Sequence, residues 1–381
     1  MKPSSQLSSE FTRPKQQRGL SLVELLVALA LGLFLMGGVI SIFVSNQENF
    51  KSTEGLARIQ ENARFSFEQL SREVREAGTT PCGVRTVLSV IRTPTPAITP
   101  WWADWNSGTF IAYDRSSAAT LAPFGTAIGQ RRAGTDAVSI LRASMIDNFL
   151  RPVEAHDTSI NQLTLSSNAN FDNKGGDVAL VCDSFSAAIF EVSLTTGAKN
   201  IQWNTLLPTS NCATALGWRK DFDCAAKVTN KQFQTDAFVT KLDSAFWYVG
   251  VSPSGTGFSL YRLTLGTAGP PGGSKNATVI RQEIVPNVAG MRVEYLVRTR
   301  VPGVAPVPDT FIEPTQWENE SGSAANYFTA ANFAWSLNNL RQVVAVRLTL
   351  DFTDSTLGVD GQPLTRQTIA VISLRNREVR Q

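Results

Sequence analysis

A run of twenty apolar or small residues near the start of the chain limits the folds open to it. Between residues 25 and 44 the only polar side chain is that of Ser41. Twenty helical residues span about 30 Å, the thickness of the hydrocarbon core of a bilayer. The run is too long for the apolar stretch of a secretory signal peptide, and no small-residue cleavage site follows it. The sequence therefore predicts a membrane-spanning helix.

The residues before this run are basic. Lys2, Arg13, Lys15 and Arg18 outnumber Glu10, so the formal charge of +3 on the whole chain resides in its first 19 residues. Positive flanks stay on the cytoplasmic side, so the rest of the chain is expected to face outward. That remainder is nearly neutral and offers no basic surface for nucleic acid, which is therefore not an expected partner.

Glu24 stands at the entrance of the apolar run, and no Lys or Arg within the run can pair with it. A carboxylate at the bilayer centre costs about 2.5–3.5 kcal/mol on insertion scales, and less near an interface. An ionisable group at this place is a functional hypothesis whose partner has to be found. We expect another chain to supply the cation. A free α-amino group is a candidate if the chain is cut just before Leu20.

The letters R-G-L-S-L-V-E at residues 18–24 resemble the leader of type IV pilins and pseudopilins. The resemblance implies that a prepilin peptidase cuts after Gly19 on the cytoplasmic side and methylates the new N-terminus, Leu20. It also implies that Glu24 pairs with the N-terminus of a neighbouring subunit. Phenylalanine is commoner than leucine directly after the cut, although other apolar residues occur there. Residues 1–19 would then be the leader.

The helix is expected to continue beyond the membrane, as the pilin resemblance also implies. Apolar residues recur every three or four positions and predict one face that packs on the protein's own sheet; they are Leu56, Ile59, Ala63, Phe67, Leu70, Val74 and Ala77. Charged residues fill the other positions, with Glu54–Arg58 and Glu68–Arg72 as predicted ion pairs. Gly78 and Pro81 end the pattern. We assign residues 20–44 to the transmembrane half and 45–80 to the amphipathic half.

Small residues within the span allow two interpretations. Ala28, Gly32, Gly37, Gly38 and Ser41 would let another helix approach closely or give local flexibility. Glycine is also commoner in membrane helices than in soluble ones, which would explain them without any contact. The sequence leaves both interpretations open.

Residues 81–381 are predicted to form a β-rich body without internal repeats or a second domain. Candidate strands are 137–141, 162–166, 177–182 and 187–194, then a hairpin of 245–251 and 258–265 around a six-residue turn, then 288–297, 344–352 and 368–374. Polar, solvent-exposed loops are expected at 302–330 and 354–362. The last three strands look like the PilW family of type IV minor pilins, which with the J-type pseudopilins are larger than major pilins. The expected fold is therefore α+β and pilin-like: a long N-terminal helix packed on an antiparallel sheet with large loops.

Four cysteines lie beyond the apolar run and form no C-x-x-C pair. An even number behind a membrane anchor favours disulfides in an oxidising compartment over free thiols or a zinc site. Cys212 with Cys224 is the natural local pair, which leaves Cys82 with Cys182, although three connectivities are open. No metal is expected.

A loop rich in proline, at 93–105, carries Trp101, Trp102 and Trp105. This aromatic trio is a candidate ligand loop for a glycan or a partner protein. The favoured alternative is that the globular body covers the three rings.

No catalytic motif is present in the sequence. The only histidine, His156, lies between polar residues and gives a Ser–His or His–metal arrangement little to build from. Asp351, Asp354 and Asp360 miss the spacing of an EF-hand, which makes calcium a weak hypothesis. We expect neither an enzyme nor a cofactor.

The family resemblance implies a minor pilin that helps to initiate pilus assembly and sits at or near the pilus tip. Its expected partners are the prepilin peptidase, other minor pilins, the major pilin and, as a further candidate, a large tip adhesin. The body would lie in the periplasm while the helix is in the bacterial inner membrane, and later on the pilus. Alternatives are a J-type pseudopilin of type II secretion, a membrane-anchored adhesin or carbohydrate-binding protein, and, less favoured, an anchored hydrolase.

Overall fold

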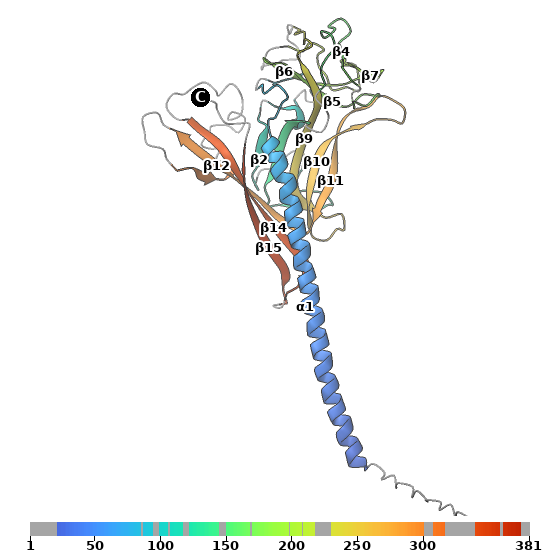
Figure 1. Cartoon of the computed structure of the whole chain (residues 1–381), viewed down its shortest axis with the longest axis vertical. Coiled ribbons are helices and arrows are strands. Elements are labelled where there is room, and N and C mark those ends of the chain that lie inside the picture. The colour runs from blue at the N-terminus through green and yellow to red at the C-terminus, as the bar shows by residue number, and fades with distance from the viewer. Residues whose placement is uncertain are drawn as a thin grey trace, which may run out of the picture.

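A computed structural model of the chain shows one long helix attached to a β-rich body (Figure 1). It describes residues 21–84, 87–93, 99–105, 107–116, 122–144, 150–167, 170–197, 199–207, 209–217, 230–300, 308–316, 340–358 and 361–374. Helix α1 spans Leu22–Glu76, and its first half extends away from the body. The predicted α+β pilin-like fold is thus confirmed.

Helix α1 ends where the sequence predicts. Ala77 caps it, with its N–H donating to the Val74 carbonyl at 3.3 Å. Gly78 then adopts a φ of +74°, a conformation that side chains other than hydrogen disfavour. The predicted ion pair Glu54–Arg58 is present at 3.0 Å. The predicted pair Glu68–Arg72 is wrong, because Glu68 instead pairs with Arg64 at 2.8 Å.

The largest sheet has eight strands. Its main order is β1-β6-β5-β9-β10-β11, with β3 beside β9 and β2 beside β3. Their bounds are β1 Val87–Ser89, β2 Phe110–Tyr113, β3 Ala137–Ala143, β5 Val178–Cys182, β6 Ala187–Glu191, β9 Phe238–Val251, β10 Phe258–Ala268 and β11 Asn276–Pro286. The predicted hairpin is β9–β10, whose register pairs Val251 with Phe258. All these pairs are antiparallel except β1 with β6.

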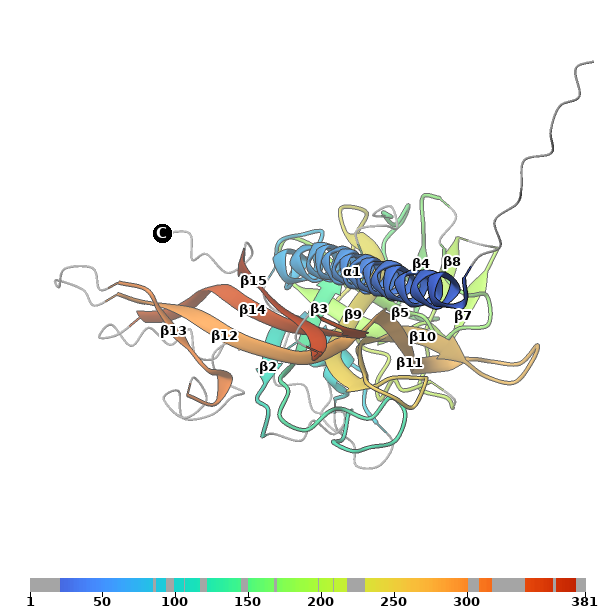
Figure 2. The same ribbon diagram turned by 90° about the horizontal axis from the view of Figure 1, so that it is seen from below.

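A second sheet of four strands has the order β13-β12-β14-β15 and is antiparallel throughout. Its bounds are β12 Val288–Arg300, β13 Thr310–Ile312, β14 Leu340–Leu357 and β15 Pro363–Ser373. A small third sheet contains β4 Gln162–Thr164, β8 Asn200–Gln202 and β7 Leu194–Thr196 in that order. Figure 2 shows the four-stranded sheet on one side of α1 and the β10–β11 hairpin on the other.

The main core lies between α1 and the two larger sheets. Ile59, Leu70 and Val74 of the helix are buried against side chains of both sheets. Burying an aliphatic side chain of this size contributes about 1.5–3 kcal/mol relative to leaving it exposed. The helix approaches the second sheet closely at Gly55, where an added Cβ would lie 2.9 Å from Leu364 Cδ1. The amphipathic half of α1 is therefore part of the body.

A disulfide ties the chain that leaves α1 to the large sheet. Cys82 and Cys182 are bonded, with Cα atoms 6.0 Å apart and a sequence separation of 100. Cys212 is also disulfide-bonded. Its expected partner, Cys224, lies outside the described residues.

Candidate functional site

The start of α1 is fixed by a side-chain cap. Ser21 has extended backbone angles, φ −72° and ψ 149°, and its Oγ accepts a hydrogen bond from the Glu24 N–H at 3.2 Å. Serine at the cap with glutamate three residues later is the spacing of a capping box. Glu24 also lies in the first turn, where a negative charge interacts favourably with the helix dipole. Sequence reasoning singled out Glu24 and missed Ser21, although the S-x-x-E spacing was there to find it.

The Glu24 side chain is exposed and forms no ion pair with any described residue. The nearest basic residue that follows it is Lys51, which lies about 40 Å farther along the helix. Gly19 and Leu20, the predicted cleavage and methylation positions, lie outside the described residues. Within the described part of the chain, Glu24 is thus a carboxylate without a cation at one end of an apolar surface.

The apolar half of α1 contacts no part of the body that the structure describes. An 18-residue window has a mean hydropathy of 2.6 and none of it is buried, so by length and composition this helix can cross a membrane. Large apolar side chains are exposed from Leu22 to Val44. Exposed apolar surface of this extent marks a membrane or a protein interface.

The glycines of the span are not required by contacts within the chain. An added Cβ at Gly32, Gly37 or Gly38 would meet no atom within 4 Å. This contrasts with Gly55, where an added Cβ would press against the side chains of Leu364 and Thr356. Packing of another chain's helix at these glycines stays a prediction.

A buried ionic cluster joins the end of α1 to the large sheet. The Glu73 side chain is 3% exposed and bridges to Arg262 of β10 at 2.9 Å and to Arg142 of β3 at 3.3 Å. Its Oε2 accepts a hydrogen bond from Trp247 Nε1 at 2.5 Å. Arg142 and Arg262 also share Asp243 of β9, at 2.6 and 3.2 Å. The cluster holds the helix and three strands in one arrangement.

A second ionic contact lies nearer the membrane half of α1. Arg58 Nε donates to Asp354 Oδ2 of β14 at 3.3 Å. Burial of Asp354 raises its pKa, but hydrogen bonds from Thr356 and Arg58 outweigh this and the pKa is lowered. Asp354 is therefore a helix contact, and Asp360 of the weak calcium hypothesis lies outside the described residues. In the described part of the chain, no three His, Cys, Asp or Glu side chains are grouped to hold a metal.

Two of the three tryptophan rings of the candidate ligand loop are buried. Trp101 begins a short 3-10 helix, Trp101–Ala103, and its ring packs edge-on against Phe246 with centroids 5.7 Å apart. Trp102 and Trp105 are 6% and 7% exposed and belong to a core cluster beneath the sheet. Two of the three rings thus fit the favoured alternative, because they fill the space between this segment and the sheet, while ligand binding at the half-buried Trp101 stays a prediction.

His156 is buried, and neither ring nitrogen has a hydrogen-bond partner of good geometry among the described residues. The ring packs on Trp203 with centroids 4.9 Å apart. Burial lowers the pKa of His156, while the Lys231 backbone and Asp157 act in the opposite direction with smaller effect. The imidazole is therefore neutral in the fold.

Acid is expected to destabilise the body through His156. In the unfolded chain its pKa returns to about 6.5, so the unfolded state takes up the proton first as the pH falls. The free energy of unfolding should decrease below that pH, by at most about 1.4 kcal/mol per pH unit. Urea unfolding of the full chain in detergent at pH 7.5 and 5.0 measures this. His156→Leu should reduce the difference, and an equal difference in both proteins would contradict the assignment.

Comparison with protein families matches residues 14–40 to the family described as Prokaryotic N-terminal methylation motif. No curated protein and no solved structure matches the chain. The matched segment contains Gly19, Leu20, Ser21 and Glu24 and runs into the exposed apolar half of α1. The motif indicates a type IV pilin-like or pseudopilin protein, which implies processing by a prepilin peptidase and assembly with other pilins.

Proposed function

We propose that the chain is a minor pilin of the PilW type that helps to initiate type IV pilus assembly and lies at or near the pilus tip. The observation that carries this proposal is the methylation motif on a helix whose apolar half the body leaves uncovered. Before assembly the helix is held in the inner membrane with the body in the periplasm. After assembly the same apolar surface is covered by the helices of neighbouring subunits.

The proposed role is assembly and not catalysis. Glu24 receives the methylated N-terminus of an adjacent subunit, and the apolar half of α1 supplies the packing surface. The amphipathic half carries the body through the Glu73 cluster and the Arg58–Asp354 contact. An adhesin that uses the tryptophan loop has less support, because Trp102 and Trp105 are buried.

A J-type pseudopilin is the alternative that shares the same motif. Deletion of the gene in the native cells distinguishes the two. Loss of surface pili with normal protein secretion supports the minor pilin, whereas loss of secretion with normal pili supports the pseudopilin.

Substitution of the residue before the cut is expected to block processing. In cells that make the protein, Gly19→Ser should leave a precursor that keeps residues 1–19, because the peptidase acts after that glycine. Leu20→Ala is the matched control and should still be cut, since an apolar residue remains after the glycine. Intact-mass and N-terminal peptide mass spectrometry measure both outcomes. Methylated Leu20 in the wild type supports the proposal, and a wild-type chain that retains residues 1–19 would overturn it.

A further inference from the structure

Strand β15 is a long sheet edge that pairs on one side only. It is the last strand of the four-stranded sheet, and its partner is β14. Among the residues that the structure describes, no strand or loop hydrogen-bonds to its outer side. The outward N–H and C=O groups of such a strand can therefore pair with a further strand.

Beyond Pro363 and Arg366 at its start, β15 lacks the features by which proteins protect exposed strands. Between residues 367 and 373 there is no charged residue and no proline. The pairing with β14 is regular from Ser373 to Leu364, and the only irregularity lies at the turn end. Ile369 and Val371 are each 56% exposed on this stretch. Charges, prolines and bulges are the usual protection, so this segment has the composition of an interior strand at an edge position.

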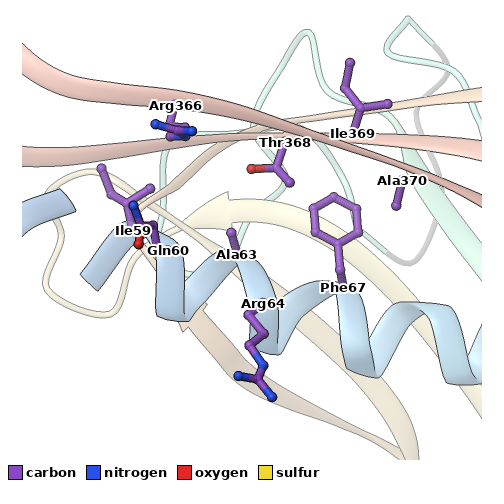
Figure 3. Close-up of a pocket in the computed structure, with 9 residues that line it drawn as sticks. All are labelled: Ile59, Gln60, Ala63, Arg64, Phe67, Arg366, Thr368, Ile369 and Ala370. Atoms are coloured by element: carbon purple, nitrogen blue, oxygen red, sulfur yellow. The ribbon is translucent and has the colours of Figure 1, made fainter. Parts of the chain in front are cut away.

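A groove lies directly beside the free edge. It has a volume of about 400 Å³ and runs between α1 and β15. Figure 3 shows Thr368 and Ala370 directed toward the helix, Phe67 of the helix directed toward the strand, and Ile369 directed away from the helix. A strand added about 4.8 Å from β15 would place alternate side chains over Ala63 and Phe67. Its other side chains would lie beside Ile369 and Val371.

The charge around the groove favours an acidic occupant. Arg64 and Arg366 are the only ionisable residues among the described residues that line it. Arg64 points away from β15 and pairs with Glu68 at 2.8 Å. Arg366 is exposed and forms no ion pair with any described residue. Strand β15 of a second copy contains no Asp or Glu and would bring no carboxylate to Arg366, which disfavours pairing of two copies through this edge.

We propose that β15 accepts a β-strand from the body of a neighbouring pilin-type subunit of different sequence. The donated strand carries apolar side chains at alternate positions and a carboxylate that reaches Arg366. The position of the edge argues for such a subunit. Strand β15 contacts α1 from Gly55 to Phe67, just beyond the apolar half. When the apolar halves of two subunits pack side by side, their helix axes are about 8–10 Å apart. The two bodies, which begin directly beyond those apolar halves, then meet at the height of β15.

This inference rests on the proposed function, and the test separates the two. The double variant Ile369→Lys with Val371→Lys places charges on exposed edge positions and should fold, be cut and be methylated as the wild type. Its incorporation into sheared pili should fall about tenfold or more, because it disrupts several cross-strand contacts at once. Leu206→Lys with Leu207→Lys is the matched control, since both leucines are exposed and follow β8, which belongs to a different sheet from β15. It should be incorporated normally.

A photo-crosslinking amino acid at Ile369 tests the contact directly in the native cells. The expected adduct is a second protein with a methylated N-terminus of the same type. The same probe at Ile280, on the outer edge strand β11, is the control and should not give that adduct. Adducts with copies of this chain alone, or normal incorporation of the lysine variant, would overturn the strand addition. Absence of the wild type from pili would instead refute the proposed function.

Arg366→Glu provides a test of the charge argument. It should reduce the crosslink yield at Ile369 several-fold, whereas Arg366→Lys should preserve it. Equal yields in both variants would show that the donated strand brings no carboxylate to this position and would overturn that part of the proposal.

Discussion

Glu24→Ala is expected to give a protein that is cut, methylated and membrane-anchored but missing from the assembled fibre. The carboxylate has no cation in the described part of the chain, so its proposed partner is the N-terminus of the next subunit. Removing one member of an ion pair buried among apolar helices costs about 3–5 kcal/mol. Because 1.4 kcal/mol is a factor of ten, incorporation should fall by more than a hundredfold. Immunoblots of sheared pili and of membranes measure the assembled and the membrane-anchored protein, respectively.

Three further variants separate the charge of Glu24 from its place in the helix cap. Glu48→Ala changes an exposed carboxylate on the same helix and should be incorporated normally. Ser21→Ala removes the cap hydrogen bond, which costs about 1 kcal/mol, and should have a mild effect. Glu24→Gln keeps a polar side chain without the charge. If it behaves as the wild type, the pairing hypothesis is wrong and the cap accounts for the residue.

Glu73→Ala is expected to destabilise the body by about 1.5–3 kcal/mol. The substitution removes one of the two carboxylates that Arg142 and Arg262 share, while Asp243 remains, and it leaves Trp247 Nε1 without an acceptor. Arg142 is itself 6% exposed, so water cannot replace the lost partner easily. A loss of this size is a large part of the 5–15 kcal/mol that usually stabilises a domain. Guanidinium unfolding of the full chain in detergent, followed by tryptophan fluorescence, measures it.

The control for Glu73 is Glu68, five positions earlier on the same helix. Glu68 pairs with Arg64 on the exposed face, and both side chains are largely in water. Exposed pairs contribute about 0–1 kcal/mol, so Glu68→Ala should leave the unfolding midpoint nearly unchanged. Equal effects of the two substitutions would show that the buried cluster does not anchor the helix.

The sequence predicted strands that carry either an alternating pattern, as in β14, or a continuous apolar run, as in β5. Val346, Leu348 and Leu350 alternate with more polar residues because β14 has one face against α1, and that alternation is visible in the letters. Strand β11 was missed. Its outer residues, such as Arg281 and Glu283, are exposed at a sheet edge, so burial imposes little pattern on it. Strand β1 was missed as well, because it has only three residues, which is too short for a recognisable pattern.

Among the residues of the candidate site, too, some could be recognised from the sequence and others could not. Glu24 was found because a charge is unusual beside a bilayer-length apolar run, which is a property of the local sequence. Glu73 could not be recognised, because its partners lie 69 to 189 positions away in sequence. The burial of Trp102 and Trp105 likewise depends on strands that arrive later in the chain. A residue that is unusual among its sequence neighbours can be recognised from the sequence. A charge or ring whose partners are distant in sequence can be assigned only from the structure.

The way α1 is held also determines how the subunit responds to mechanical load. Contacts between helix and body are spread from Gly55 to Ala77, along the helix axis. A pull along that axis loads these contacts in shear, so they resist together and do not open one after another. The Cys82–Cys182 disulfide adds a covalent link between the residues that follow the helix and strand β5 of the large sheet. Tension applied at the membrane end of the subunit is thereby transmitted to the large sheet even if the helix begins to slide.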